Sequence, residues 1–242
     1  MFIMDVVIYY LYYDIVFDKS KYPKNVPIVE LPSEMIEFLI KRVSRIFEEQ
    51  KALITFEAPV KIFGDIHGQY TDLLHRFKEM QEKNKNEFQG DRIISMETRY
   101  LFMGDYVNRG KQSCEVICLL YALLVRFPRQ VVILRGNHEC MSITKIYGFF
   151  DEIKRRYKIS LWQAFYNSFN HMPLVALIDE KIMCMHGGIS MHMNSFEQVE
   201  QIPKPTDIPD EGLMADLLWN DPDEAVNDWE ENERGCGYVF GR

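Results

Sequence analysis

The sequence lacks paired cysteines, a long uninterrupted apolar run and a secretion signal. Its five cysteines (114, 118, 140, 184 and 236) form no Cys-x-x-Cys pair, and the odd number fits poorly with a disulfide framework. The apolar segment 1–17 is interrupted by Asp5 and Asp14, so it falls far short of the roughly 20 residues that a spanning helix needs. It also lacks a basic start and a small-residue cleavage site. We therefore expect a reduced intracellular protein, cytoplasmic or nuclear, without a membrane partner.

Two features keep an alternative open. We expect residues 1–17 to form a strand or helix that covers the body of the protein, with a membrane anchor as the minority reading. Cys114 and Cys118 lie one helical turn apart, a spacing that permits metal chelation. Because both lie in or beside an apolar run, we expect them to pack in the core as small hydrophobic side chains.

Basic residues are the minority of the charges. The chain has 28 Lys and Arg against 36 Asp and Glu, a formal net charge of -8. Binding of nucleic acid depends on neutralising phosphates with basic side chains, so nucleic acid is not an expected partner. Net charge says nothing about a single cleft, so it does not exclude a local basic pocket.

Four short polar motifs each follow an apolar, strand-like run. Strands packed in one sheet bring their carboxyl ends to a common rim, where open α/β sheets bind ligands. There the motifs would gather two Asp, one Asn and up to three His, a donor set that suits Mn, Fe or Zn. Two such ions about 3.5–4 Å apart are the arrangement of many phosphatases. The motifs are Gly64-Asp65-Ile66-His67, Gly104-Asp105, Gly136-Asn137-His138-Glu139 and His186-Gly187-Gly188, after strands at 60–63, 100–103, 131–134 and 182–185.

The pattern between the motifs is that of a βαβ-type α/β sandwich. A helix start at Pro32-Ser33-Glu34 precedes apolar residues at helical spacing over 36–47, after a polar linker at 19–27. We further expect helices over 72–83 and 112–126, a solvated surface loop over 83–97, and two or three helices between 140 and 170. A hairpin with its turn at Asp179-Glu180 and a short helix ending at Trp219 follow.

The motifs GDIHGQ (64–69), GDYVNRG (104–110), RGNHEC (135–140) and HGG (186–188) resemble the phosphoprotein phosphatase family of metallophosphoesterases. Further stretches are similar to the type-1 serine/threonine phosphatase catalytic subunits: YGFFDEIKRRY (147–157), PTDIPDEGLMADLLWNDPD (205–223) and ENERGCGYVFG (231–241). The resemblance runs from about Val29 to Arg242. It implies an N-terminal extension at 1–28 and an incomplete catalytic domain at 29–242.

The resemblance implies an α/β fold, a metallophosphoesterase-type β-sandwich flanked by helices that lacks its C-terminal strands. It implies two metal ions, Mn or else Fe or Zn. One would be held by Asp65, His67 and Asp105, the other by Asp105, Asn137 and His186, with Asp105 bridging. Arg109 and Arg234, together with Asn137, would grip the substrate phosphate, and His138 would be the general acid. A metal-activated water would attack phosphorus directly, with no covalent intermediate.

Two departures from the family pattern bear on activity. Asn108 replaces the aspartate that pairs with the general-acid histidine, so it can accept a hydrogen bond from His138 but supplies no charge. The family domain also continues beyond Arg242 with a further histidine ligand, an active-site tyrosine, the last strands and most of the groove for regulatory subunits, of which the region of Ile182 remains. We expect a weakened second metal site and exposed strand edges. An incomplete gene model, a degenerate paralogue and a weak enzyme remain as explanations.

The expected activity is hydrolysis of phosphoserine and phosphothreonine in phosphoprotein substrates, with regulatory subunits as further partners. The alternative is an inactive pseudophosphatase that binds phosphoproteins or acts as a scaffold. A metallophosphoesterase for diesters or nucleotides is the weaker rival, because the RRY (155–157) and DLLWNDPD (216–223) stretches resemble the protein phosphatase branch.

Overall fold

Two three-stranded sheets form the centre of the protein. The computed structural model describes residues 2–13, 28–88 and 92–242, so the expected linker at 19–27 lies outside the described residues. The first sheet pairs β2 (Val60–Phe63), β3 (Arg99–Phe102) and β4 (Val131–Ile133), all parallel. The second pairs β1 (Leu53–Phe56) with β5 (Val175–Ile178) in parallel and β5 with β6 (Ile182–Met185) antiparallel. A small third sheet contains β7 (Asp221–Pro222), β8 (Trp229–Glu231) and β9 (Tyr238–Phe240).

The expectation that all four motif strands share one sheet is wrong. β2, β3 and β4 lie in the first sheet, but β6 lies at the edge of the second, where the predicted hairpin turn places it beside β5. A buried apolar cluster joins the two sheets, and its members are Leu101, Val132, Leu134, Ala176, Ile178 and Cys184. The motif strands therefore meet across a packed core rather than along one row.

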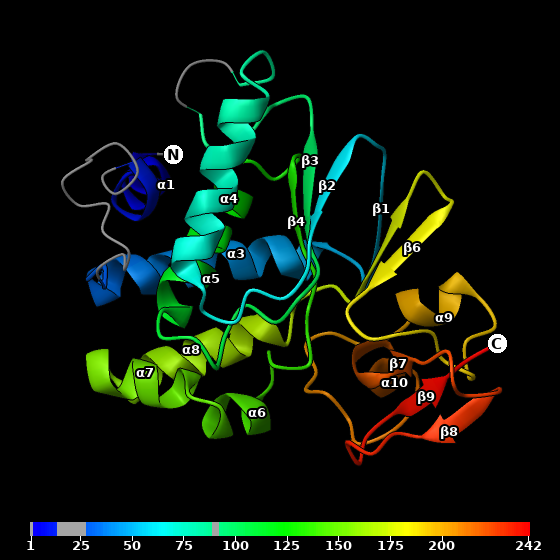
Figure 1. Ribbon diagram of the computed structural model, residues 1–242. Coiled ribbons are helices and arrows are strands. Elements are labelled where there is room, and N and C mark those ends of the chain that lie inside the picture. Colours follow the sequence, from blue (N-terminus) through cyan, green and yellow to red (C-terminus); the bar gives the residue numbers. More distant parts are fainter. Residues whose placement is uncertain (1, 14–27, 89–91) are drawn as a thin grey trace.

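The helices lie mostly on one side of the parallel sheet, as Figure 1 shows for α3 (Ser33–Glu49), α4 (Tyr70–Lys83), α5 (Ser113–Arg126) and α8 (Ile159–Phe169). The expected helices at 36–47, 72–83 and 112–126 are confirmed. Every residue of α5 from Ser113 to Leu124 is buried, because α1, α3, α7 and the sheet surround it. Cys114 and Cys118 belong to this helix and are buried free thiols, as expected.

Three helices fill the interval between 140 and 170, at the upper end of the expected number. They are α6 (Met141–Ile146), α7 (Phe149–Arg156) and α8. Further along, α9 (Phe196–Glu200) precedes α10 (Leu213–Trp219), which ends at Trp219 as predicted. Two histidines outside the motifs, His75 on α4 and His192 in a loop, are exposed.

The segment 83–97 differs from the expected solvated loop. Its described part buries Phe88, Ile93 and Ile94, and the Ser95 amide donates to the hydroxyl of Tyr100, at 2.9 Å. The mean polarity of the segment hides these apolar residues. These buried side chains anchor the segment, which connects α4 to β3.

The N-terminal segment covers the helical layer, as expected, over the described residues 2–13. α1 (Phe2–Ile8) packs on α5, and Asp5 forms an ion pair with Arg126 at 2.7 Å. The following π-helical turn η1 (Tyr9–Tyr13) buries Leu11 and Tyr12 completely, and the Tyr12 hydroxyl donates to Gln81 at 2.6 Å. Within the described residues, no helix is both long and apolar enough to cross a membrane.

Replacement of Leu11 by alanine is expected to lower the free energy of unfolding by about 2–5 kcal/mol, because it opens a cavity under η1. Chemical denaturation measures the loss. Tyr9→Ala is the matched control: Tyr9 lies in the same turn but is 53% exposed, so its truncation should change stability little. Equal destabilisation by both variants would mean that η1 is held by something other than the burial of Leu11.

Candidate metal centre and phosphate-binding site

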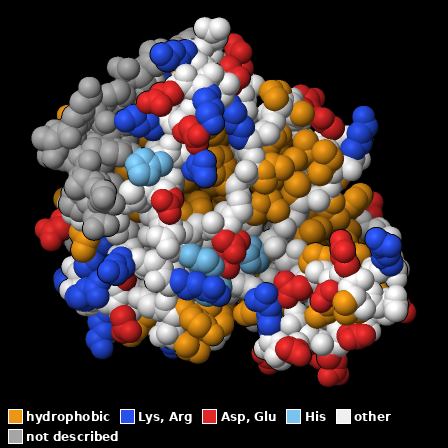
Figure 2. All heavy atoms as spheres, in the orientation of Figure 1, with side chains coloured by type: hydrophobic (Ala, Val, Ile, Leu, Met, Phe, Trp, Pro, Cys, Tyr) orange, Lys and Arg blue, Asp and Glu red, His pale blue; other side chains and the backbone are white. Residues whose placement is uncertain are grey.

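The residues that the sequence singled out lie around one cavity of about 220 Å³. Asp65 and His67 follow β2, Asp105 follows β3, and Asn137 and His138 follow β4, since parallel strands end at the same rim. The second sheet contributes His186, directly after β6. Figure 2 shows histidine side chains near the centre of this face, with basic and acidic groups beside them. The cavity is lined by Asp65, His67, Asp105, Arg109, Asn137, His138, His186, Gly187, Leu218, Trp219, Asp221 and Arg234.

Asp105 is the centre of the ligand cluster. Its Oδ2 lies 3.3 Å from Nε2 of His67, and its Oδ1 lies 3.4 Å from Nε2 of His186. Two groups of potential ligand atoms, each within 4.8 Å, share it: His67, Asp105 and His138, and Asp65, Asp105 and His186. Oδ2 of Asp65 also lies 3.8 Å from Nε2 of His67, so the expected pairing of these two side chains at one ion is compatible with the geometry. In both groupings Asp105 is the shared member, as a bridging carboxylate requires.

Backbone carbonyls orient the two histidine rings. Nδ1 of His67 lies 2.9 Å from the carbonyl oxygen of Val107, and Nδ1 of His186 lies 3.2 Å from that of Met103. A carbonyl accepts a hydrogen bond and cannot donate one, so each neutral ring carries its proton on Nδ1. Nε2 is then left with a free electron pair facing Asp105, which is the arrangement of metal-binding histidines.

Asn137 provides the test of whether the site fits metal ions. Its Nδ2 donates to the carbonyl of Leu218 at 3.1 Å, which fixes the amide orientation. Its Oδ1 is buried and has no hydrogen-bond partner among the residues that the structure describes. A buried oxygen without a partner costs free energy, and a cation in the cavity would remove that cost. Together with the carboxylates and imidazoles, this oxygen completes a donor set that fits divalent ions.

Glu139 is a site residue whose role is not evident from the sequence. Its buried carboxylate accepts hydrogen bonds from the amides of Asp105 at 2.8 Å, Tyr106 at 2.9 Å and Gly136 at 3.0 Å. It therefore ties the turn after β3 to the turn after β4. Its place in RGNHEC was a signal, but residue type alone does not separate it from a solvated glutamate.

The turns that carry the site adopt an uncommon backbone conformation. His67, Asp105, Asn108 and Arg109 have φ values of 43°, 56°, 72° and 62°, in the left-handed region that side chains rarely enter. At Gly136 a Cβ atom would come within 2.3 Å of the amide nitrogen of Asp105, so no larger residue fits there without a shift of the backbone. Such strain persists where surrounding contacts over-determine the turn, here through Glu139.

Burial raises the pKa of both central carboxyl groups. The pKa of Asp105 rises to about 7, mainly because burial disfavours its charge and then because Asp65 lies nearby, while the hydrogen bond from the His138 amide opposes the shift. Burial and the neighbouring Asp105 raise the pKa of Glu139 to about 7. Between a pH of about 4, the carboxyl pKa of the unfolded chain, and about 7, the folded metal-free protein is therefore expected to bind more protons at these two groups than the unfolded chain does.

The metal-free protein is therefore expected to lose stability as pH rises from about 5 to about 7. In this window the folded state binds more protons than the unfolded state, so the free energy of unfolding falls with pH. Thermal unfolding in a chelator at pH 5.5 and 7.5 measures the effect. Saturating Mn²⁺ should reduce it, because a bound cation compensates the charged carboxylates. The Asp105→Asn variant, which has one of the two carboxyl groups fewer, is the control and should show a smaller dependence.

The hydrogen bond between Asn108 and His138 runs opposite to the expected direction. The Asn108 Oδ1 accepts the backbone N–H of Phe149 at 3.0 Å, so its Nδ2 faces Nδ1 of His138 at 2.9 Å. We expected the amide oxygen to accept from the imidazole. An amide N–H must donate, so Nδ1 of His138 has to be the acceptor, and the neutral ring then carries its proton on Nε2. Burial, followed by the nearby His67 and Arg109, lowers the pKa of His138 to about 3.

Two arginines lie at the cavity. Nη2 of Arg109 lies 3.4 Å from Nε2 of His138. Arg234 lies in the β8–β9 turn and is paired with Asp221, with Nε and Oδ2 2.9 Å apart. Planar guanidinium groups at the same cavity as the ligand cluster suit a tetrahedral oxyanion, which they bind with paired hydrogen bonds.

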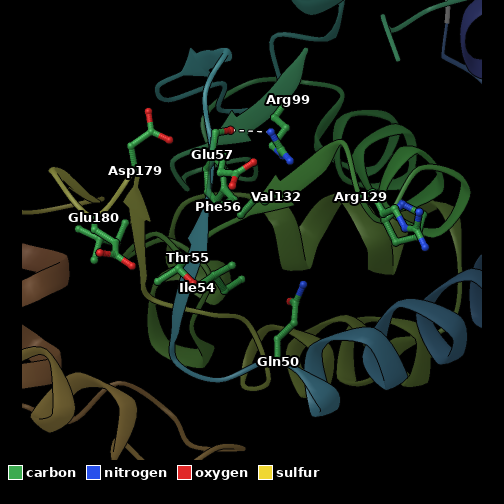
Figure 3. A pocket seen from close by; sticks show the side chains of 12 residues that line it. Gln50, Ile54, Thr55, Phe56, Glu57, Arg99, Arg129, Val132, Asp179 and Glu180 are labelled. Atoms are coloured by element: carbon green, nitrogen blue, oxygen red, sulfur yellow. Dashed lines mark hydrogen bonds between the residues drawn. The ribbon is translucent and has the colours of Figure 1, made fainter. Parts of the chain in front are cut away.

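A larger cavity, about 710 Å³, lies near the amino-terminal ends of β3 and β4. Figure 3 shows Arg99 and Arg129 on one side of it and Asp179 and Glu180 on the other, with Arg99 donating to the carbonyl of Glu57 at 2.7 Å. None of the motif residues lines it, and it contains no histidine or cysteine. The chemistry therefore belongs to the smaller cavity.

Comparison with known proteins agrees with this geometry. Residues 58–242 match the calcineurin-like phosphoesterase family. A solved protein serine/threonine phosphatase from Saccharomyces cerevisiae, described as similar to human phosphatase PP5, has 31% sequence identity and a TM-score of 0.79. The match covers 88% of this chain and 65% of the yeast chain, so this chain spans less than two thirds of that protein.

A more distant likeness is a cold-active protein-tyrosine phosphatase from the psychrophile Shewanella sp. It is 22% identical over 60% of this chain and 46% of its own, with a TM-score of 0.45. The family match extends over most of the chain and includes all four motifs. The chain belongs to the calcineurin-like phosphoesterases, a family of metal-dependent hydrolases.

Proposed function

We propose that the protein is a metal-dependent serine/threonine protein phosphatase that hydrolyses phosphoserine and phosphothreonine. The observation that carries the proposal is the convergence of Asp65, His67, Asp105, Asn137 and His186 on one cavity with two arginines. The likeness to the yeast serine/threonine phosphatase supports the choice of substrate. Phosphoproteins would be its substrates, and regulatory subunits its further partners.

In this proposal Asp65, His67, Asp105, Asn137 and His186 hold two ions. When bound, the ions supply Lewis-acid activation of water and of the phosphoryl group. Arg109 and Arg234 hold the phosphate oxygens and orient the ester. His138 would act as the general acid in its doubly protonated form, passing the proton on Nε2, the atom that faces Arg109, to the departing serine or threonine oxygen and returning to the neutral ring.

Asn108 favours a second candidate, an inactive or slow pseudophosphatase that binds phosphoproteins. To act as a general acid, the His138 ring must carry a proton on each nitrogen. The Asn108 amide N–H points at Nδ1 and therefore disfavours a proton there. Phosphate binding would use the two arginines and any metal ions held by the ligand cluster. It does not need the second proton on His138. A chain with this site would therefore still bind phosphorylated segments.

Metal content and two substrates separate the candidates. Two ions per chain, measured by mass spectrometry, with hydrolysis of 4-nitrophenyl phosphate and phosphoserine peptides, support the enzyme. One ion or none, retained phosphopeptide binding and no turnover of either substrate support the pseudophosphatase. Preferred hydrolysis of a diester such as bis(4-nitrophenyl) phosphate would contradict both.

A further inference from the structure

A basic surface adjoins the phosphate-binding cavity on α6 and α7. The Arg109 amide donates to the carbonyl of Tyr147 at 2.9 Å, and the Tyr147 ring lies 5.4 Å from the His138 ring, centroid to centroid. The connection between α6 and α7 is therefore part of the rim of the cavity. Ile146, 71% exposed, and Tyr147 form an apolar step at this rim.

Four exposed cations flank this step in the sequence, Lys145 before it and Lys154, Arg155 and Lys158 after it. None of them has an ion-pair partner among the residues that the structure describes. From 141 to 169 the sequence holds two acidic residues, Asp151 and Glu152, and Glu152 is buried against Arg156 at 2.8 Å. Asp151 is exposed and offsets part of this charge. Figure 2 shows basic side chains over α7 and apolar ones over α6, toward the histidines.

An aromatic pair holds two of these lysines in place. The rings of Phe150 and Trp162 lie 5.1 Å apart, edge to face. Lys145 Nζ lies 5.4 Å from the centre of Trp162, and Lys154 Nζ lies 5.7 Å from that of Phe150. Cation–π contact restricts both side chains before any partner arrives, so less rotamer freedom is lost on binding.

We propose that Lys145, Lys154, Arg155 and Lys158, the basic surface, bind acidic residues that flank the phosphorylated residue of a substrate. The inference rests on the proposed function and narrows its substrate class to phosphosites with Asp or Glu nearby. In this proposal, a peptide whose phosphate lies in the cavity crosses the step at Ile146 and Tyr147, and its acidic residues contact the basic surface beyond it. In a chain of net charge -8, this local charge selects acidic segments at the site itself.

The test compares two peptides that carry a non-hydrolysable phosphonate analogue of phosphoserine, one flanked by Asp and one by Asn. Fluorescence anisotropy with the full, Mn²⁺-loaded chain should give about tenfold tighter binding of the Asp peptide at low salt, with the difference shrinking as salt is raised. The double variants Lys145→Glu/Lys154→Glu and Lys145→Gln/Lys154→Gln should both abolish the difference. Their KM for 4-nitrophenyl phosphate should stay within about twofold of the parent, which also reports that they fold.

Lys41→Glu/Lys181→Glu is the matched control, because both lysines are exposed on other elements. It should keep the preference. Equal affinity for the two peptides, or loss of the preference in this control, would overturn the inference, as would equally tight binding of an acidic peptide without phosphonate. If no variant hydrolyses 4-nitrophenyl phosphate but the preference persists, the proposed enzymatic function fails while the inference stands.

Discussion

The Asn108→Asp variant is expected to hydrolyse phosphoserine peptides about 10²-fold faster than the parent. The new carboxylate would keep the Phe149 N–H on one oxygen and present the other to Nδ1 of His138. That oxygen accepts a hydrogen bond from a protonated Nδ1, which the Asn108 amide N–H cannot do, and its charge stabilises the imidazolium. General-acid catalysis contributes about 10²–10⁴ in rate, so a gain at the lower end needs no other change.

The comparison of leaving groups makes this prediction specific. Turnover of 4-nitrophenyl phosphate should rise less than about threefold, because 4-nitrophenolate departs without a proton. The His138→Ala/Asn108→Asp double variant should lose the gain on peptides. A similar increase on both substrates, or a gain that survives without His138, would place the effect outside proton transfer.

The Asp105→Asn variant is expected to lose bound metal and at least about 10³-fold in turnover on both substrates. Asp105 belongs to both ligand groups, so its loss weakens both ion sites at once. An amide can still accept the His138 N–H, which Asp105 Oδ1 accepts at 2.9 Å, so the fold should persist. The rate estimate follows from the several kcal/mol that metal ions contribute to stabilising the transition state.

Metal analysis and titration of Mn²⁺ into chelator-treated protein check this result. Asp72→Asn is the matched control, because Asp72 is an exposed carboxylate on α4 outside both ligand groups. It should keep two ions and parent activity. Full metal occupancy with unchanged turnover in the Asp105 variant would remove Asp105 from the proposed mechanism.

The sequence was sufficient to locate the strand ends and the polar residues that follow them. An apolar run followed by glycine and a polar residue marks a place where the chain leaves the core and turns, and this pattern located Asp65, Asp105 and Asn137 correctly at a common rim. Helices with apolar residues at helical spacing, such as α3, were equally readable. These features depend on neighbours in the sequence.

The remainder depends on contacts between distant segments. The predicted hairpin places β6 beside β5, but no local pattern indicates that this hairpin joins β1 in a second sheet rather than the parallel sheet, since a short apolar run fits either. The direction of the Asn108 amide is decided by the Phe149 N–H, 41 positions away. Glu139 acts through amides of the turn after β3, and the burial of Ile93 and Ile94 opposes the polarity of their surroundings.

The division of the proposed ligands between two sheets has a consequence for the lifetime of the bound ions. Four of the five follow strands of one sheet, and His186 alone follows the other, across the small cluster that contains Leu101 and Cys184. If the two sheets separate at this apolar cluster, the seam, His186 should move away from Asp105, while the four ligands on the first sheet should keep their positions. Ion release should therefore track local opening between the sheets, and thinning the seam by Leu101→Ala should shorten ion residence well before the chain unfolds.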